Sequence, residues 1–208
     1  MLRVGLTGGI ASGKSAVAEI MREIGCYVLD ADRMAHRLIE PGQAAYAGVV
    51  NEFGRDILDA EGRILRPNLA DIVFASPQRL ARLNAIVHPP VLKELEIELA
   101  RLARNDSRGV AVVEAALLVE SGYHHSLDRL IVVWCTPEQQ LARLTDPASG
   151  RGMTPEQAQR RIAAQLSLAE KRKLATDEIN CSGTLDQTRR QVTALVDRLK
   201  RGAVPSAT

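Results

Sequence analysis

Short apolar runs alternate along the chain with segments of helical periodicity. Four of the runs are apolar nearly throughout rather than at every second position, at residues 3–8, 26–32, 109–118 and 129–136. Continuous apolar runs are typical of strands buried on both faces, which occur mainly in parallel sheets. Helical patterns are found at 14–24, 137–144, 155–174 and 185–200. The pattern predicts an α/β fold with a parallel sheet covered by helices.

Two of these helix starts carry a capping box. Thr136 and Thr154 are each followed by proline, glutamate and glutamine. Threonine is a favoured N-cap, proline suits the first helical position, and a glutamine at the third position can bond back to the cap. The sequence therefore predicts that helices begin after both threonines.

The region between the second and third apolar runs has little strand character. It shows helical spacing at 33–40, 45–53, 69–74, 78–87 and 91–104, with a polar loop around "DAEGR" at 59–63. We therefore predict a core made of residues 1–32 and 108–202, with a helical insertion at 33–107. The polar residues 203–208 are expected to form a disordered tail.

Composition narrows the classes of protein. A chain of 208 residues suits one main domain, and a net charge of +2 gives no reason to expect nucleic acid or an anionic membrane as partner. No run approaches ~20 apolar residues and no signal peptide is recognisable, so we expect a cytoplasmic protein. Cys26, Cys135 and Cys181 are odd in number and have no metal-ligand spacing. We expect them to be buried, reduced thiols.

Residues Gly8 to Ser15 read G-x-x-x-x-G-K-S, between a predicted strand and a predicted helix. This is the context of a phosphate-binding P-loop, in which glycines let successive backbone N–H groups converge on phosphates. Lys14 would reach the β- and γ-phosphates, and the Ser15 hydroxyl would bind Mg²⁺. A glycine-rich turn with an incidental lysine is the alternative, but the pattern arises by chance in only about one chain of this length in a hundred.

Carboxylates follow two of the predicted strands. Asp30 and Asp32 come at the end of the second run, on the carboxyl edge where ligands of open α/β sheets bind. A carboxylate there can accept the proton of an acceptor hydroxyl and help hold Mg²⁺. Capping of the next helix would equally explain an aspartate. Glu114, after the third run, is a further candidate for binding the metal, or a charge that ends a strand.

An arginine-bearing lid is the third expected element of a phosphotransferase. Arg143 and Arg151 flank the loop "LTDPASG", and we place a lid at about 143–155. Guanidinium groups there could spread over the oxygens of a transferring phosphate. For each arginine alone, a solvated helix face is the alternative interpretation.

P-loops serve switches, motors and kinases alike, so the motif alone leaves the activity open. A GTPase switch is disfavoured, because N-K-x-D is absent and "DAEG" at 59–62, a formal D-x-x-G match, follows no predicted strand. The remaining alternatives are a small-molecule or nucleoside kinase and, from another class, a nucleotide-dependent regulatory switch.

The chain resembles the dephospho-CoA kinase family along nearly its whole length. The shared residues are "GLTGGIASGKS" at 5–15, "DAD" at 30–32, "EPG" at 40–42, "FG" at 53–54, Arg66 with Leu69, "HP" at 88–89, "LLVESG" at 117–122, the pattern PE.QL.R at 137–143, and Gln165. The resemblance implies a three-layer P-loop fold with an acceptor-binding insertion and a lid. It also implies that ATP phosphorylates the ribose 3′-hydroxyl of dephospho-CoA, with Mg²⁺, in the last step of coenzyme A biosynthesis.

The resemblance further implies roles for individual residues. Asp32 would act as the base-like residue near the acceptor hydroxyl, together with Lys14 and Arg143 as catalytic residues. Thr7, Asp32, Arg66 and His88 would bind the acceptor, although a helix-initiating His-Pro turn is an equal alternative for His88. Residues that would bind ATP are Gly9, Ala11, Ser12, Gly13, Lys14, Ser15, Ala16 and Arg151. ATP and dephospho-CoA are then the partners, and we favour a monomer over an oligomer.

Several positions depart from the family pattern. Ala11 stands where the family usually has glycine, and Ala16 where it usually has threonine. Thr176 and Cys181 replace a usual Asp and Asn near the expected adenine side. These changes leave nucleotide selectivity open, but Lys14, Ser15, Asp32 and Arg143 are all present.

Overall fold

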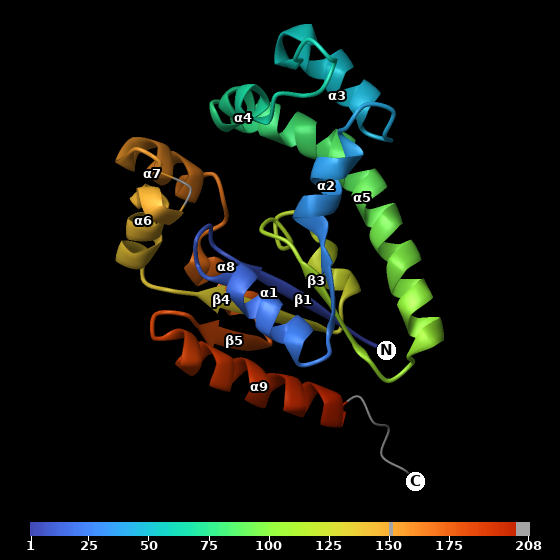
Figure 1. Cartoon of the computed structure of the whole chain (residues 1–208), viewed down its shortest axis with the longest axis vertical. Helices are drawn as coiled ribbons and strands as arrows, with labels where there is room; N and C mark the ends of the chain where they lie inside the picture. The colour runs from blue at the N-terminus through green and yellow to red at the C-terminus, as the bar shows by residue number, and fades with distance from the viewer. Residues whose placement is uncertain (150–151, 203–208) are drawn as a thin grey trace. The chain divides into compact units, whose positions relative to one another are not determined.

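A computed structural model describes residues 1–149 and 152–202 (Figure 1). The chain divides into two compact units, which we describe separately. One contains Met1–Asp30 and Leu99–Thr208, and the other contains Ala31–Glu98. Arg151, part of the predicted lid, and the predicted tail at 203–208 lie outside the described residues.

The first unit is built on a parallel sheet, as predicted. Its strands are β1 (Leu2–Gly8), β2 (Tyr27–Asp30), β3 (Val110–Glu114), β4 (Arg129–Trp134) and β5 (Asp177–Asn180), in the spatial order β2-β3-β1-β4-β5. Helices α1 (Lys14–Glu23) and α9 (Leu185–Gly202) pack on one face, where Val4 and Leu6 of β1 join the main apolar core. The α/β three-layer fold is confirmed.

Alternate residues of β1 serve the two faces of the sheet. Val4 and Leu6 belong to the core under α1 and α9. On the other face, Gly5 packs beside Leu118 and Leu127, and Thr7 bonds to Ala116. The segment after β3 therefore covers the second face, next to the start of the phosphate loop.

Strand β5 was not predicted from the sequence. Only Ile179 of its four residues is buried, and Asp177, Glu178 and Asn180 are polar. An edge strand contacts a neighbour on one side only, so it needs no continuous apolar run.

The helices after β4 correct one prediction. Helix α6 (Pro137–Thr145) confirms the helix predicted at 137–144, and the short 3₁₀ turn η3 (Pro147–Ser149) follows it. Two helices, α7 (Pro155–Ala163) and α8 (Leu168–Leu174), replace the single helix expected at 155–174. The chain leaves the helix after Ala164 and restarts at Ser167, which forms a capping box with Glu170. The predicted capping boxes at Thr136 and Thr154 are both present. The Ser167 box has the sequence pattern S-x-x-E but lacks the proline that follows Thr136 and Thr154.

The second unit is helical. It contains α2 (Ala31–Leu38), α3 (Tyr46–Phe53), the 3₁₀ turn η1 (Arg55–Ile57), α4 (Arg66–Phe74) and most of α5 (Pro77–Asn105). The helices predicted at 78–87 and 91–104 are one helix, with Pro89 and Pro90 inside it. The interpretation of His88 as part of a helix-initiating turn is therefore wrong.

A continuous buried stripe explains why α5 survives its two prolines. The buried side chains recur at helical spacing on both sides of them, at Val87, Val91, Leu95, Leu99 and Leu102. Each proline removes one backbone donor, but apolar burial of about 1.5–3 kcal/mol per side chain offsets that loss.

The structure also tests the prediction for the three cysteine thiols. Cys26, Cys135 and Cys181 are free and buried, as predicted.

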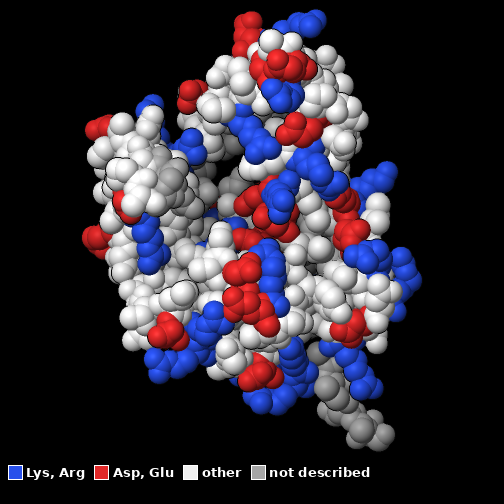
Figure 2. Space-filling model, in the orientation of Figure 1, with Lys and Arg blue, Asp and Glu red and all other residues white. Residues whose placement is uncertain are grey.

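Among the residues that the structure describes, no helix is long and apolar enough to cross a membrane. On the face shown in Figure 2, basic and acidic side chains are interspersed. A short 3₁₀ turn, η2 (Tyr123–Ser126), completes the described elements.

Candidate active site

The phosphate loop connects β1 to α1 in a conformation that its sequence permits. Gly13 directly precedes α1 with φ 105°, in the left-handed region that glycine tolerates best. A Cβ atom added to Gly13 would lie 2.9 Å from Cys181 Cβ, so a side chain there would collide with the segment after β5. Ala11 also has a positive φ, 59°, a conformation that glycine adopts at a lower cost than alanine. Ser15 and Ala16 lie exposed in the first turn of α1.

Side chains from other elements hold the loop in shape. Gln140 Nε2 donates to the carbonyl oxygen of Ile10 at 2.7 Å, and the Ile10 N–H donates to Gln165 Oε1 at 3.0 Å. A Cβ atom on Gly9 would meet Gln140 Nε2 at 2.5 Å, so the loop runs close to this amide. Both polar backbone groups of Ile10, the N–H and the carbonyl, are therefore bonded to side chains that hold the loop in place.

Ser12 provides an observation that points toward a ligand. It is fully buried, and its Oγ has no hydrogen-bond partner among the described residues. Buried hydroxyl groups are nearly always paired, because an unmade hydrogen bond costs about 1–3 kcal/mol. A group that enters the loop could satisfy this hydroxyl.

Lys14 and Glu114 form an ion pair beside the loop. Lys14 Nζ lies 2.9 Å from Glu114 Oε1, and Arg22 Nη2 lies 3.7 Å from Glu114 Oε2. Glu114 is the last residue of β3 and is only 4% exposed. The register of the sheet sets it between Leu6 of β1 and Asp30 of β2. The structure therefore brings the predicted lysine and the predicted strand-end acid together at the carboxyl edge.

Arg143 ties the loop to the segment after β5. It extends from the last turn of α6 and donates from Nη1 to the Ala11 carbonyl at 3.2 Å and from Nη2 to the Cys181 carbonyl at 2.8 Å. The sequence predicts Arg143 as a lid arginine. Residue spacing does not show that the carbonyl groups of Ala11 and Cys181 are its hydrogen-bond acceptors. Burial raises the pKa of the Cys135 and Cys181 thiols, while the nearby Arg143 charge acts in the opposite direction on both.

Thr7 lies beneath the loop on the second face of the sheet. It is fully buried, and its Oγ1 donates to the Ala116 carbonyl at 3.2 Å. Lys171, also fully buried, donates to the same carbonyl from α8 at 2.7 Å. Sequence reasoning missed Lys171, because it stands in the run Lys171-Arg172-Lys173, which resembles a solvated helix face.

The two aspartates of "DAD" belong to different elements. Asp30 is the last residue of β2, and Asp32 is the second residue of α2, because the helix begins at Ala31 without an intervening loop. The N-cap position thus falls to Asp30 rather than Asp32. A carboxylate in the first turn of a helix is stabilised by the helix dipole.

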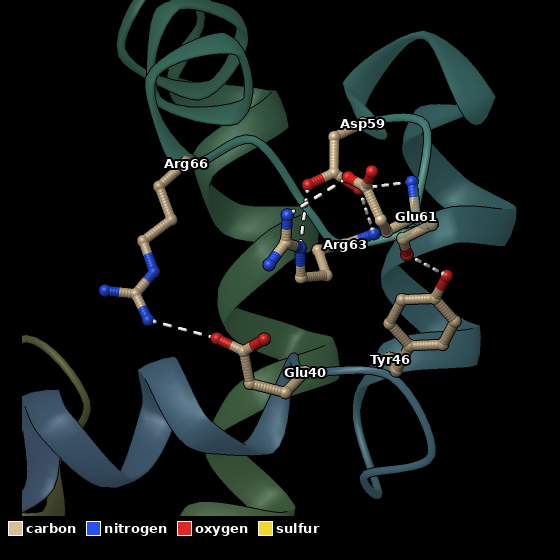
Figure 3. A network of polar contacts seen from close by, with 7 residues as sticks. Glu40, Tyr46, Asp59, Glu61, Arg63 and Arg66 are labelled. Atoms are coloured by element: carbon tan, nitrogen blue, oxygen red, sulfur yellow. Dashed lines mark hydrogen bonds and ion pairs between the residues drawn. The ribbon is translucent and has the colours of Figure 1, made fainter.

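Arg66 and His88, two other predicted acceptor residues, lie in the second unit. Arg66 begins α4, and its Nη2 lies 3.2 Å from Glu40 Oε1, as Figure 3 shows. His88 is half-buried in α5, and burial lowers its pKa from the ordinary value. Its imidazole is therefore held in the neutral form more strongly than an exposed histidine.

A small hairpin-like loop precedes Arg66. Leu58 and Ile64 form an antiparallel bridge, and Asp59 accepts from the Glu61 N–H, the Arg63 N–H and Arg63 Nε at 2.7–3.0 Å (Figure 3). These bonds, first of all the backbone bond from Arg63, hold the pKa of the Asp59 carboxyl below its usual range. The "DAEG" match at 59–62 is thus a turn that fixes the chain just before Arg66.

Oxygen donors suit the Mg²⁺ ion that a P-loop implies. The Ser15 hydroxyl and the Glu114 carboxylate are the hard oxygen groups that would hold the ion, and Mg²⁺ is usually held by one or two such groups together with substrate phosphates. Across residues 1–149 and 152–202, no group of three or more His, Cys, Asp or Glu side chains could hold a metal ion. The residues present fit an ion that arrives with a nucleotide.

Comparison with known proteins gives the family. The family model described as dephospho-CoA kinase matches residues 2–187. A dephospho-CoA kinase of Geobacillus kaustophilus is 44% identical over 195 residues, which are 94% of this chain and 95% of that protein. A crystal structure of a Thermus thermophilus protein is 34% identical, with a TM-score of 0.78, over 95% of this chain and 97% of that one. The Campylobacter jejuni dephospho-CoA kinase, at 24% identity, has the same fold, with a TM-score of 0.69 over 97% and 98% of the two chains. The chain therefore belongs to the dephospho-CoA kinase family.

Proposed function

We propose that this chain transfers the γ-phosphoryl group of ATP to the ribose 3′-hydroxyl of dephospho-CoA, giving coenzyme A and ADP. The observation that carries the proposal is the Lys14–Glu114 pair at 2.9 Å beside a loop whose Gly13 admits no side chain. Family membership gives the substrate class, because the curated relatives are dephospho-CoA kinases.

Nucleotide binding falls to the first unit. The backbone of residues 9–13 and the start of α1 would hold the β- and γ-phosphates, with Lys14 neutralising part of their charge. The buried Ser12 hydroxyl is available to a phosphate oxygen. Mg²⁺, bound with the nucleotide near Ser15 and Glu114, would neutralise further charge on the phosphates. Arg143 keeps the loop in shape through the Ala11 and Cys181 carbonyls.

Acceptor binding falls to residues 31–98, the second unit. Arg66 is an exposed guanidinium at the start of α4, and it can exchange Glu40 for the pyrophosphate of dephospho-CoA. Asp32 would accept the proton of the 3′-hydroxyl group. The hydroxyl oxygen would attack the γ-phosphorus in line with the departing ADP oxygen. Positioning and charge neutralisation supply most of the rate in such reactions.

The simplest working form is a monomer in the cytoplasm. Sedimentation of the active enzyme would test this part of the proposal.

ADP release measured against a panel of acceptors tests the function. Dephospho-CoA should stimulate ADP release many-fold over the acceptor-free rate, and the product should be coenzyme A by mass and by elution. Shikimate, gluconate and nucleosides should not stimulate it. Stimulation by one of those acceptors alone would make the chain another small-molecule kinase, and slow hydrolysis that no acceptor changes would indicate a switch.

A further inference from the structure

Lys171 is the most unusual buried residue of the first unit. It is fully buried in α8, where every residue is described and the other six are at least partly exposed. In the same helix Leu174 is 48% exposed. A helix normally buries its leucine and exposes its lysine, because a desolvated ammonium costs several kcal/mol unless it is paired. The burial of Lys171 must therefore depend on its polar contacts.

One contact of the Lys171 ammonium leads to the strand before the phosphate loop. Lys171 Nζ donates to the Ala116 carbonyl at 2.7 Å. The same carbonyl accepts from Thr7 Oγ1 at 3.2 Å, and Thr7 is the last but one residue of β1. The ammonium thereby fixes the chain after β3 to the base of the loop.

A second contact of the Lys171 ammonium leads to the loop itself. Lys171 Nζ lies 2.9 Å from Glu120 Oε1, and this oxygen also accepts from the Leu166 N–H at 3.0 Å. The residue before Leu166 is Gln165, whose Oε1 accepts from the Ile10 N–H. Leu168 follows and lies close to Gly9, since a Cβ atom there would be 3.2 Å from Leu168 Cγ.

We infer that Lys171 is a positioning residue for nucleotide binding. Its ammonium group holds the phosphate loop in place through two chains of contacts, which we call arms. One arm runs through Ala116 to Thr7, and the other through Glu120 and residues 165–166 to Ile10. Both arms and the loop belong to the first unit. The inference rests on the proposed function only in that the loop binds ATP.

The test compares nucleotide binding with stability. The variants are Lys171→Met, which keeps the volume and removes the charge, and the double variant Lys171→Met with Glu120→Gln, which leaves no unpaired carboxylate. The amide oxygen that Glu120→Gln introduces can still accept from the Leu166 N–H, but the link to the Ala116 carbonyl is lost in both variants. Lys173→Met is the matched control, because Lys173 is an exposed lysine of the same helix.

We expect both Lys171 variants to bind a fluorescent N-methylanthraniloyl ATP with a Kd about 10- to 100-fold higher, since small misplacements of a phosphate site are costly. The double variant should melt within about 4 °C of the wild type, and Lys173→Met should bind within about twofold. In steady-state kinetics the KM for ATP should rise and that for the acceptor should not.

Wild-type nucleotide affinity in the double variant would overturn the inference, and so would an equal loss in Lys173→Met. If Lys171→Met alone does not fold, the double variant decides. The binding measurement needs no acceptor. An error in the proposed acceptor would appear only in the ADP-release panel and would leave this result intact.

Discussion

Lys14 Nζ and Glu114 Oε1 lie 2.9 Å apart, and Glu114 is the last residue of a strand buried in the sheet. The lysine is therefore already oriented toward the carboxyl edge. A phosphate that binds Lys14 has to share the ammonium with this carboxylate or replace it.

We predict that Lys14→Ala weakens binding of Mg·ATP and nearly abolishes phosphoryl transfer, because a point charge on the phosphates is lost. The substitution also removes the closer of two cations from the buried Glu114, leaving Arg22 at 3.7 Å, so stability should fall. Turnover and thermal melting measure the two effects. The double variant Lys14→Met with Glu114→Gln should recover the melting temperature without recovering turnover. Wild-type turnover in Lys14→Ala would refute the P-loop assignment.

Asp32→Asn should separate the base-like role from a structural one. The residue is the second of α2 and not its N-cap, so an amide there should change the melting temperature little. General-base contributions are typically ~10²–10⁴-fold, and kcat for 3′-phosphorylation should fall by about that factor. Asp30→Asn is the control and should be milder. Greater sensitivity of Asp30 would move the acceptor-facing role to the strand-end carboxylate.

Arg66→Ala should raise the KM for dephospho-CoA and leave that for ATP nearly unchanged, because only acceptor binding would lose a charge. Arg63→Ala is the matched control, since Arg63 bonds Asp59 and Glu61 within the preceding loop. It should affect the melting temperature more than either KM. Equal losses for both substrates in Arg66→Ala would indicate a folding defect instead.

Arg143→Lys should not preserve function, although the charge is kept. The guanidinium bonds two carbonyls on different segments, at Ala11 and Cys181, and an ammonium lacks this fork geometry. We expect kcat/KM for ATP to fall about 10- to 100-fold, mostly through ATP binding. A fall in kcat with unchanged ATP affinity would show that Arg143 contacts the transferring phosphate rather than shaping the loop.

The stability of the protein should depend on His88 as the pH falls. Burial lowers the pKa of this imidazole in the folded protein, whereas in the unfolded chain it stays near its ordinary value of about 6.5. Below that value the unfolded state binds more protons, so the free energy of unfolding decreases from about pH 7 to pH 5. Urea unfolding of His88→Gln should show a smaller decrease. A higher KM for dephospho-CoA in this variant would support acceptor binding, and an unchanged KM would favour a structural role.

The sequence predicted the parts of the fold that local patterns encode. The strands β1 and β4 are continuous apolar runs, and the capping boxes at Thr136 and Thr154 define helix starts without reference to the rest of the chain. Strand β5 was missed because Asp177, Glu178 and Asn180 carry no such run. The two prolines of α5 by themselves predict a helix boundary. The buried stripe on both sides of them, which offsets their cost, depends on packing that a local pattern does not show.

The site, like the fold, has features that local patterns encode and features that depend on packing. Lys14, Ser15 and Glu114 follow from motif and strand end. Arg143 and Lys171 also bond to backbone carbonyl groups, at Ala11, Cys181 and Ala116, which are 38–132 residues distant in the chain. Every residue has a carbonyl group, so the sequence gives no sign of which one is used.

Ala11, with φ 59°, bears on which loop sequences this family can use. The left-handed conformation costs an alanine about 1–2 kcal/mol, while alanine in place of glycine recovers about 0.4–1 kcal/mol by restricting the unfolded chain. The strain exceeds this gain, so the alanine at this position is kept at a net cost of about 1 kcal/mol. Position 13 cannot accept even an alanine in this way, because any side chain there would meet Cys181. Two positions of one loop that share a positive φ thus tolerate a side chain to very different degrees.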